Sequence, residues 1–158
     1  PCSANGTPTN FGAAATITGE PFPEQEPLYE WRHYRTSAGT FGLDCNVPNG
    51  VYSLLFKWAN ASATDHKTKF DVVLEGVTVV AGLEITVEAG GVNIALDRTY
   101  TAVVSDGTLT IRVVGVSNAP NQVIWAQMNA VEITDLGPIP DNAKASGGVV
   151  TSGGVVFK

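Results

Sequence analysis

Aromatic and amide side chains gather at a few points of the sequence where predicted strands meet predicted loops. Trp31 and Tyr34 fall in one short segment, Trp58 is soon followed by Asn60, and Trp125 comes directly after a polar stretch. The flat face of an aromatic ring can stack on the C–H side of a sugar ring, and an amide can hydrogen-bond to its hydroxyls. These five residues are therefore candidates for a carbohydrate-binding site.

Two of these candidates also have a structural interpretation. Trp58 shares its strand parity with Leu54 and Phe56, which favours a place in the hydrophobic core. Tyr34 and the neighbouring Arg35 could form a buried pair in which the guanidinium bonds backbone carbonyls. The sequence leaves both alternatives open.

Catalytic chemistry finds little support in the sequence. His33 and His66 are expected at the surface, and no serine or cysteine is tied to either of them by a known motif. There is no glycine-rich phosphate loop and no metal-binding motif. We expect no catalytic residues, no metal and no cofactor, and keep a calcium ion bound by a carboxylate such as Asp65 or Asp97 as an alternative.

The chain has two cysteines, Cys2 and Cys45. A disulfide between them would attach the N-terminal arm to the rest of the domain, and we predict that it forms. The alternative is a pair of free thiols, because Cys45 shares its parity with Phe41 and Leu43 and could be a small buried residue.

Composition restricts the partners. The 158 residues suit one domain, and the formal net charge of -6 comes without a basic cluster larger than His66, Lys67 and Lys69, so we expect no nucleic acid. No apolar run approaches the ~20 residues of a membrane helix, so we expect no membrane insertion. Scarce lysine with abundant Ser, Thr, Asn and Gly is typical of an extracellular protein or one at a cell or virion surface.

The elements that must position these residues are short strands. Apolar residues alternate through residues 41–47, 51–58 and 70–74, and turn residues recur every 8–12 positions, which predicts an all-β antiparallel sandwich without helices. We expect a strand to continue from Leu83 through Val87. Asp106-Gly107 predicts a hairpin that pairs the two alternating runs on either side of it.

Three regions differ in character. Residues 1–27 form a predicted arm with a proline-rich loop, residues 28–135 the predicted sandwich, and residues 136–158 a Gly/Val-rich tail that contains the sequence GGVV twice. The tail is either a loosely packed linker or a strand that pairs with another subunit.

The segment from Tyr34 to Ile133 resembles the malectin and malectin-like domains. The resemblance rests on ordered pieces of sequence: Tyr34-Arg35, Val47-Pro48-Asn49-Gly50 with Tyr52, Phe70-Asp71-Val72 with Glu75-Gly76, Asp106-Gly107 with Leu109 and Ile111, and Asn129-Ala130-Val131-Glu132-Ile133. Asn60 stands where the family usually has a glutamate. The resemblance implies a jelly-roll-like β-sandwich that binds a glycan or polysaccharide without catalysis.

Two hypotheses for the function follow. The first is an extracellular or surface carbohydrate-binding module. The second is a structural subunit, such as a phage or virion decoration or fibre protein or a surface filament subunit, whose two tails pack on identical or other subunits. The second is motivated by the charge-poor arm, the low overall charge and the repeated GGVV of the tail.

Overall fold

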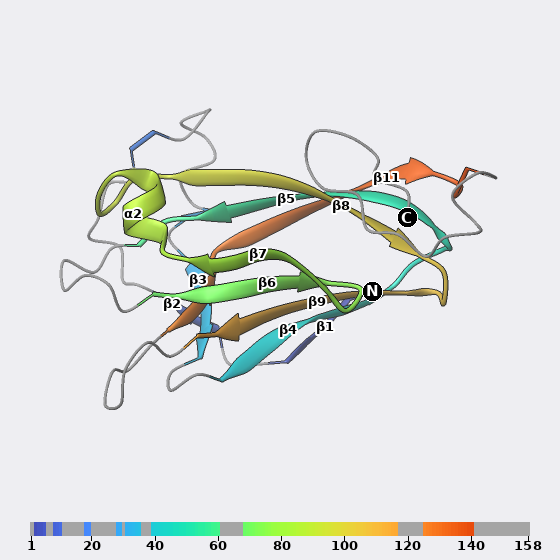
Figure 1. Cartoon of the computed structure of the whole chain (residues 1–158), viewed down its shortest axis with the longest axis horizontal. Coiled ribbons are helices and arrows are strands. Elements are labelled where there is room, and N and C mark those ends of the chain that lie inside the picture. The colour runs from blue at the N-terminus through green and yellow to red at the C-terminus, as the bar shows by residue number, and fades with distance from the viewer. Residues whose placement is uncertain are drawn as a thin grey trace.

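A computed structural model describes residues 2–5, 8–10, 18–19, 28–29, 31–35, 39–60, 68–116 and 125–140. Two antiparallel sheets pack face to face (Figure 1), one of five strands in the order β1-β4-β9-β6-β7 and one of three in the order β11-β5-β8. This confirms the predicted all-β sandwich. The strands of the larger sheet are β1 (Cys2–Asn5), β4 (Thr40–Asn46), β9 (Thr108–Gly115), β6 (Phe70–Leu74) and β7 (Val77–Leu83), and those of the smaller are β11 (Ala130–Gly137), β5 (Gly50–Trp58) and β8 (Leu96–Val104).

Strand β5 shows how the sequence builds the core. Its even-numbered side chains from Tyr52 to Trp58 are all buried, whereas Val51, Ser53 and Leu55 on the opposite face are half-buried. The same alternation on β6 and β9 turns their apolar side chains toward β5 across the sandwich. The core therefore lies between the two sheets, as the alternation predicts.

A third, smaller sheet lies at one end of the sandwich. It has the order β10-β3-β2 and consists of β10 (Ala126–Met128), β3 (Trp31–Arg35) and β2 (Pro8–Asn10). Figure 1 shows β3 at the end of the sandwich at which β5 finishes, running across the direction of the long strands, and the short helix α2 (Ile85–Ala89) follows β7 at this end. Residues of the predicted arm thus add strands to two of the three sheets.

The strand expected from Leu83 through Val87 is wrong in its second half, because residues 85–89 form the helix α2. Gly90 ends this helix in the left-handed conformation, with a φ of 85°, which glycine adopts at low cost. Ile85 and Thr86 are both buried while Val87 is 59% exposed, a pattern that a single helical turn allows and a strand does not.

The hairpin predicted at Asp106-Gly107 is also wrong. The local turn is present, because Asp106 accepts a hydrogen bond from the Thr108 amide and Gly107 has a φ of 84°. However, β8 before the turn pairs with β5, and β9 after it pairs with β4 and β6. The turn carries the chain from one sheet to the other across the core.

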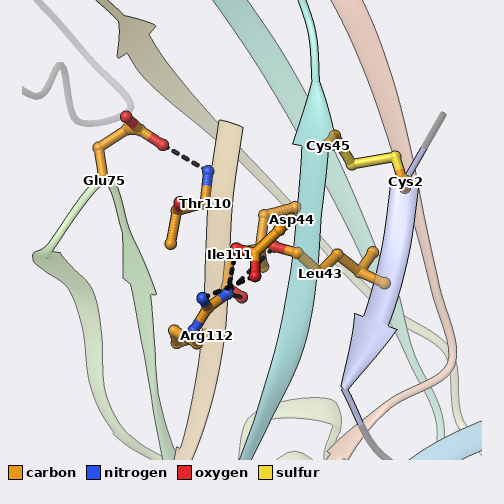
Figure 2. The surroundings of a disulfide bond; sticks show 8 residues. All are labelled: Cys2, Leu43, Asp44, Cys45, Glu75, Thr110, Ile111 and Arg112. Atoms are coloured by element: carbon orange, nitrogen blue, oxygen red, sulfur yellow. Dashed lines mark hydrogen bonds and ion pairs between the residues drawn. A yellow bond between two sulfur atoms is a disulfide. The ribbon is translucent and has the colours of Figure 1, made fainter. Parts of the chain in front are cut away.

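The disulfide between Cys2 and Cys45 is confirmed. The two residues face each other in the register between β1 and β4 (Figure 2). It attaches the beginning of the described chain to the edge of the larger sheet, as expected for a disulfide that holds an arm.

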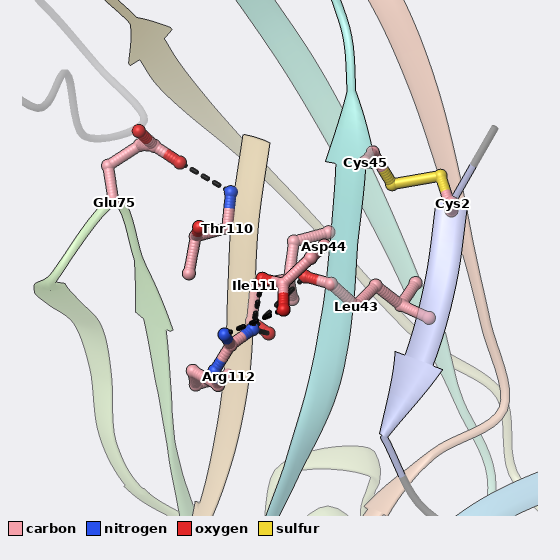
Figure 3. Close-up of polar contacts among 8 residues, drawn as sticks. All are labelled: Cys2, Leu43, Asp44, Cys45, Glu75, Thr110, Ile111 and Arg112. Carbon is pink, nitrogen blue, oxygen red and sulfur yellow. Dashed lines mark hydrogen bonds and ion pairs between the residues drawn. A yellow bond between two sulfur atoms is a disulfide. The ribbon is translucent and has the colours of Figure 1, made fainter. Parts of the chain in front are cut away.

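The outer face of the larger sheet carries polar contacts (Figure 3). Arg112 on β9 faces Asp44 on β4 with both terminal nitrogens, at 2.7 Å and 3.0 Å from the two carboxylate oxygens. The hydrogen bond from Arg112 lowers the pKa of Asp44. Glu75, in the turn between β6 and β7, accepts a hydrogen bond from the Thr110 amide, while its partial burial raises its pKa.

These opposite pKa shifts predict opposite pH dependences for two variants. Glu75 ionises less readily in the folded state, so its contribution to the unfolding free energy falls as pH rises through its raised pKa. The wild type should therefore lose stability relative to Glu75→Gln between about pH 4 and neutrality, in urea titrations at several pH values. Glutamine keeps the oxygen that accepts the Thr110 bond.

Asp44→Asn is the matched control, because the pKa of Asp44 is lowered. The stabilising effect of its carboxylate is present above the ordinary pKa and is lost as pH falls through the lowered one. The wild type should accordingly lose stability relative to Asp44→Asn on acidification. Parallel curves for the wild type and Glu75→Gln would contradict the account of Glu75.

The division at residues 27/28 and 135/136 stays a prediction. Strand β11 runs to Gly137, and the described chain ends at residue 140. The interpretation of the tail as a linker or an intersubunit strand falls on residues that lie outside the described ones. No helix within the described ranges has the length and apolarity needed to cross a membrane.

Candidate functional site

The residues predicted to bind sugar gather at one end of the sandwich, which we call the β3–β10 end. We define it as residues 31–35, 58–60 and 125–129. Antiparallel pairing sets Tyr34 opposite Gln127 and Arg35 opposite Ala126. Ala126 is the residue that follows Trp125 in the chain. The end of β5 joins them, because the Trp58 indole Nε1 donates a 3.0 Å hydrogen bond to the carbonyl of Gln127. For β3, the structure describes the backbone and not the side chains.

Trp58 belongs to the hydrophobic core. Its exposed fraction is 0%, its ring stacks on Phe56 with centroids 5.2 Å apart, and Phe70 lies 6.1 Å away on a tilted plane. A ring enclosed in this way presents no face to a ligand. This is the structural interpretation that its strand parity favoured.

Asn60 is buried as well, and Trp125 is half-buried. The Asn60 amide donates to the Thr68 hydroxyl, and its backbone carbonyl accepts from the Asn93 amide at 2.8 Å. Among the candidate residues with described side chains, Trp125 is therefore the one that is not fully buried.

A network of amides around the buried Gln127 connects the strands of this end. The Gln127 amide donates to the carbonyl of Ala59 at 2.6 Å and to the Asn129 Oδ1 at 2.9 Å. Asn129 also accepts from the Ala59 backbone amide and donates to the backbone carbonyl of Tyr29. Because buried amides are costly to leave unpaired, these bonds fix the end of β5 against β10 and against the chain that leads into β3.

A buried lysine lies beside this network. Lys57 has an exposed fraction of 0%, and its Nζ lies 3.1 Å from Asp97 and 3.4 Å from Glu132, whose side chains are 23% and 48% exposed. Tyr29 covers it, with the ring centroid 5.5 Å from Nζ and the hydroxyl donating to Asp97 at 2.6 Å. A buried ammonium needs such partners, so this cluster holds Tyr29, two positions before β3, against the outer face of β5.

Sequence reasoning missed Lys57, Gln127 and Asn129 as parts of this end. A signal for Gln127 and Asn129 is that two amide residues interrupt the last apolar strand, where each needs a partner if buried. Lys57 has no such signal, because its parity places it on the outer face of β5, where the distant Tyr29 covers it. Asp97, the described one of the two calcium candidates, is paired with Lys57 and Tyr29, whereas Asp65 lies outside the described residues. Within the described ranges, no three His, Cys, Asp or Glu side chains form a group suited to a metal ion.

Comparison with known proteins agrees with this architecture. The solved structures that are similar include a Bacteroides uniformis β-glucuronidase, with a TM-score of 0.67 at 17% identity over 84% of this chain and 14% of that one. The ANXUR2 extracellular domain of Arabidopsis thaliana matches with a TM-score of 0.67 at 15% identity, over 81% of this chain and 38% of that one. The Arabidopsis ANX1 ectodomain matches with a TM-score of 0.70 at 14% identity, over 86% and 42%. The chain thus spans less than half of each of these proteins.

At these identities the similar structures establish the fold alone. No curated protein matches the sequence. The sequence model of the Malectin domain, however, matches residues 12–147, which is most of the chain and includes the whole β3–β10 end. The chain therefore belongs to the malectin domain family.

Proposed function

We propose that the chain is a non-catalytic, extracellular carbohydrate-binding module whose glycan is bound at the β3–β10 end. The observation that carries the proposal is the pairing of β3 with β10, which brings the strand of Trp31 and Tyr34 beside the half-buried Trp125. Sugar sites combine aromatic faces with amide and carboxylate groups, and this end has the half-buried amide of Asn129, which the buried Gln127 holds in place.

Two sets of residues have different roles at this end: one contacts the sugar and the other supports the end from within. Trp125 and Tyr34, which pairs with Gln127 beside Trp125, are the proposed contacts for the sugar, with Trp31 on the same strand as a further candidate. Trp58 and Asn60 are buried and support the end from within, so they drop out of the proposed contacts. Membership of the malectin family and the disulfide Cys2–Cys45 are consistent with a module that works outside the cell.

The alternative of a virion or filament subunit has no support in the similar structures or in the described residues. Strand β1 pairs with β4 of its own chain, and the C-terminal tail lies outside the described residues. The similarity to a β-glucuronidase covers 14% of that chain and does not argue for hydrolysis by this domain.

The test is a glycan array that includes neutral and acidic oligosaccharides and polysaccharides, probed with the labelled wild type and Trp125→Ala. We expect the wild type to bind at least one glycan class and the variant to bind it at least about tenfold more weakly, which corresponds to ~1.4 kcal/mol. Trp125→Phe keeps a ring and should retain part of the affinity. Leu136→Ala is the matched control, because Leu136 is exposed on β11 near the start of β5, at the opposite end of the sandwich.

A folded wild type that binds nothing on a broad array contradicts the proposal. So does a Trp125→Ala variant with unchanged affinity and unchanged unfolding free energy. If Leu136→Ala lost as much affinity as Trp125→Ala, the result would contradict a glycan site at the β3–β10 end.

A further inference from the structure

Among the strands that the structure describes, β1 forms the edge of the larger sheet and has β4 as its neighbour there. The pairing covers four residue pairs, from Cys2 opposite Cys45 to Asn5 opposite Gly42. Cys2 is exposed to solvent, whereas Cys45 is 1% exposed. The covalent bond to Cys45 thus reinforces a short ladder of hydrogen bonds at a sheet edge, and one of its sulfur-bearing residues is within reach of a reagent in solution.

Strand β4 is held in the sheet by contacts that do not involve β1. It pairs with β9 along all seven of its residues, from Thr40 to Asn46. Figures 2 and 3 show Arg112 on β9 reaching the Asp44 carboxylate on β4, on the side of the strand away from the disulfide. The same guanidinium donates to the carbonyl of Leu43 at 3.2 Å. Removing the disulfide therefore leaves β4 with its main partner.

We propose that the disulfide Cys2–Cys45 is a redox-sensitive latch that holds β1 at the edge of the larger sheet. When the disulfide is closed, β1 covers residues 42–45 of β4. When it is reduced, β1 detaches and the outer edge of β4 opens to solvent while the sandwich stays folded. The basis is the contrast between a four-residue ladder at the edge and a seven-residue ladder with an ion pair behind it.

The chemistry requires a dithiol reductant. A thiolate of the reductant attacks the Sγ of exposed Cys2, which breaks the protein disulfide, forms a mixed disulfide and releases Cys45 as a thiolate. The second thiol of the reductant then attacks the reductant's own sulfur in the mixed disulfide. This step forms the cyclic disulfide of the reductant and releases Cys2 as a thiolate. The reductant gives up two electrons and two protons, and the protein gains the thiols of Cys2 and Cys45.

Hydrogen exchange of the full chain, with and without dithiothreitol, tests the latch. In the reduced protein, peptides that contain residues 42–45 should exchange at least about tenfold faster at the amides facing β1. Peptides from β5 should exchange at an unchanged rate, since the core does not depend on β1. Unchanged exchange at residues 42–45 overturns the proposal, and so does a simultaneous loss of protection in β5, which would make the disulfide a requirement for the whole fold.

Two variants separate the latch from general effects of the reductant. Cys2→Ser in oxidising buffer should exchange like the reduced wild type and should not respond to dithiothreitol. Arg112→Gln removes the ion pair to Asp44 and weakens the hold of β9 on β4, so its reduced form should lose protection over residues 40–46 as well. Loss of protection at the β9-facing amides of residues 40–46 in the reduced wild type would overturn the assignment of β4 as the strand that stays.

Discussion

The Trp58→Ala variant is expected to lose about 3–5 kcal/mol of unfolding free energy, the range for truncating a large aromatic residue in a core. The indole is fully buried, stacked on Phe56 and tilted against Phe70, so its removal leaves a cavity between the two sheets. It also leaves the buried carbonyl of Gln127 without its 3.0 Å indole donor. Urea unfolding, with the slope compared between variants, measures the change.

Trp58→Phe is the matched variant, because it keeps an aromatic ring and loses the indole N–H. We expect it to lose about 1–3 kcal/mol, from the smaller volume and the unpaired Gln127 carbonyl. A loss below ~1 kcal/mol in Trp58→Ala would contradict the place of this ring in the core, and would return Trp58 to the proposed sugar contacts.

The Gly42→Ala variant is expected to be destabilised by about 3 kcal/mol, at the upper end of what overpacking usually costs. A Cβ at this position would lie 1.9 Å from the carbonyl oxygen of Ile111 and 2.9 Å from its carbonyl carbon. Both are backbone atoms of β9, so β4 and β9 must separate, which also strains the contact between Asp44 and Arg112. Thermal and urea unfolding measure the effect.

Gly76→Ala provides the comparison for Gly42→Ala. Gly76 has a φ of 77°, and among the described residues nothing beyond its chain neighbours lies within 4 Å of its would-be Cβ, so its substitution should cost only the conformational strain of about 1–2 kcal/mol. Gly42 is not in the left-handed region, and its cost comes from the clash alone. Equal stability of Gly42→Ala and the wild type would show that β4 and β9 do not approach as closely as described.

The sequence predicts the fold well where apolar residues alternate over a long strand and both faces of that strand are covered. On β5 the parity of Leu54, Phe56 and Trp58 predicts both the strand and its buried face. It fails where the outcome depends on distant partners. The turn at Asp106-Gly107 has the chemistry of a hairpin, yet the partners of its two flanking strands are chosen by the sandwich as a whole.

The sequence can nominate residues for the candidate site, but it cannot predict which of them are buried or which residues support them. Residue type and position next to loops identify Trp125 and Asn60, and the structure brings β10, which follows Trp125, against the end of β5, which precedes Asn60. The burial of Lys57 could not be predicted, because its cover is Tyr29, 28 residues earlier in the chain. The exposed or buried state of an amide such as Asn60 likewise depends on its partner, here Thr68.

The measurement that tests the central claim most directly is a chemical-shift titration of the isotopically labelled wild type with the strongest array ligand. We predict that the shifting amides cluster at the β3–β10 end, in residues 31–35 and 125–129, and that the outer face of β11-β5-β8 stays unchanged. Trp125→Ala should abolish most of these shifts while its remaining spectrum stays that of the folded protein. Shifts confined to another surface, or no shifts at saturating oligosaccharide, would contradict a glycan site at this end.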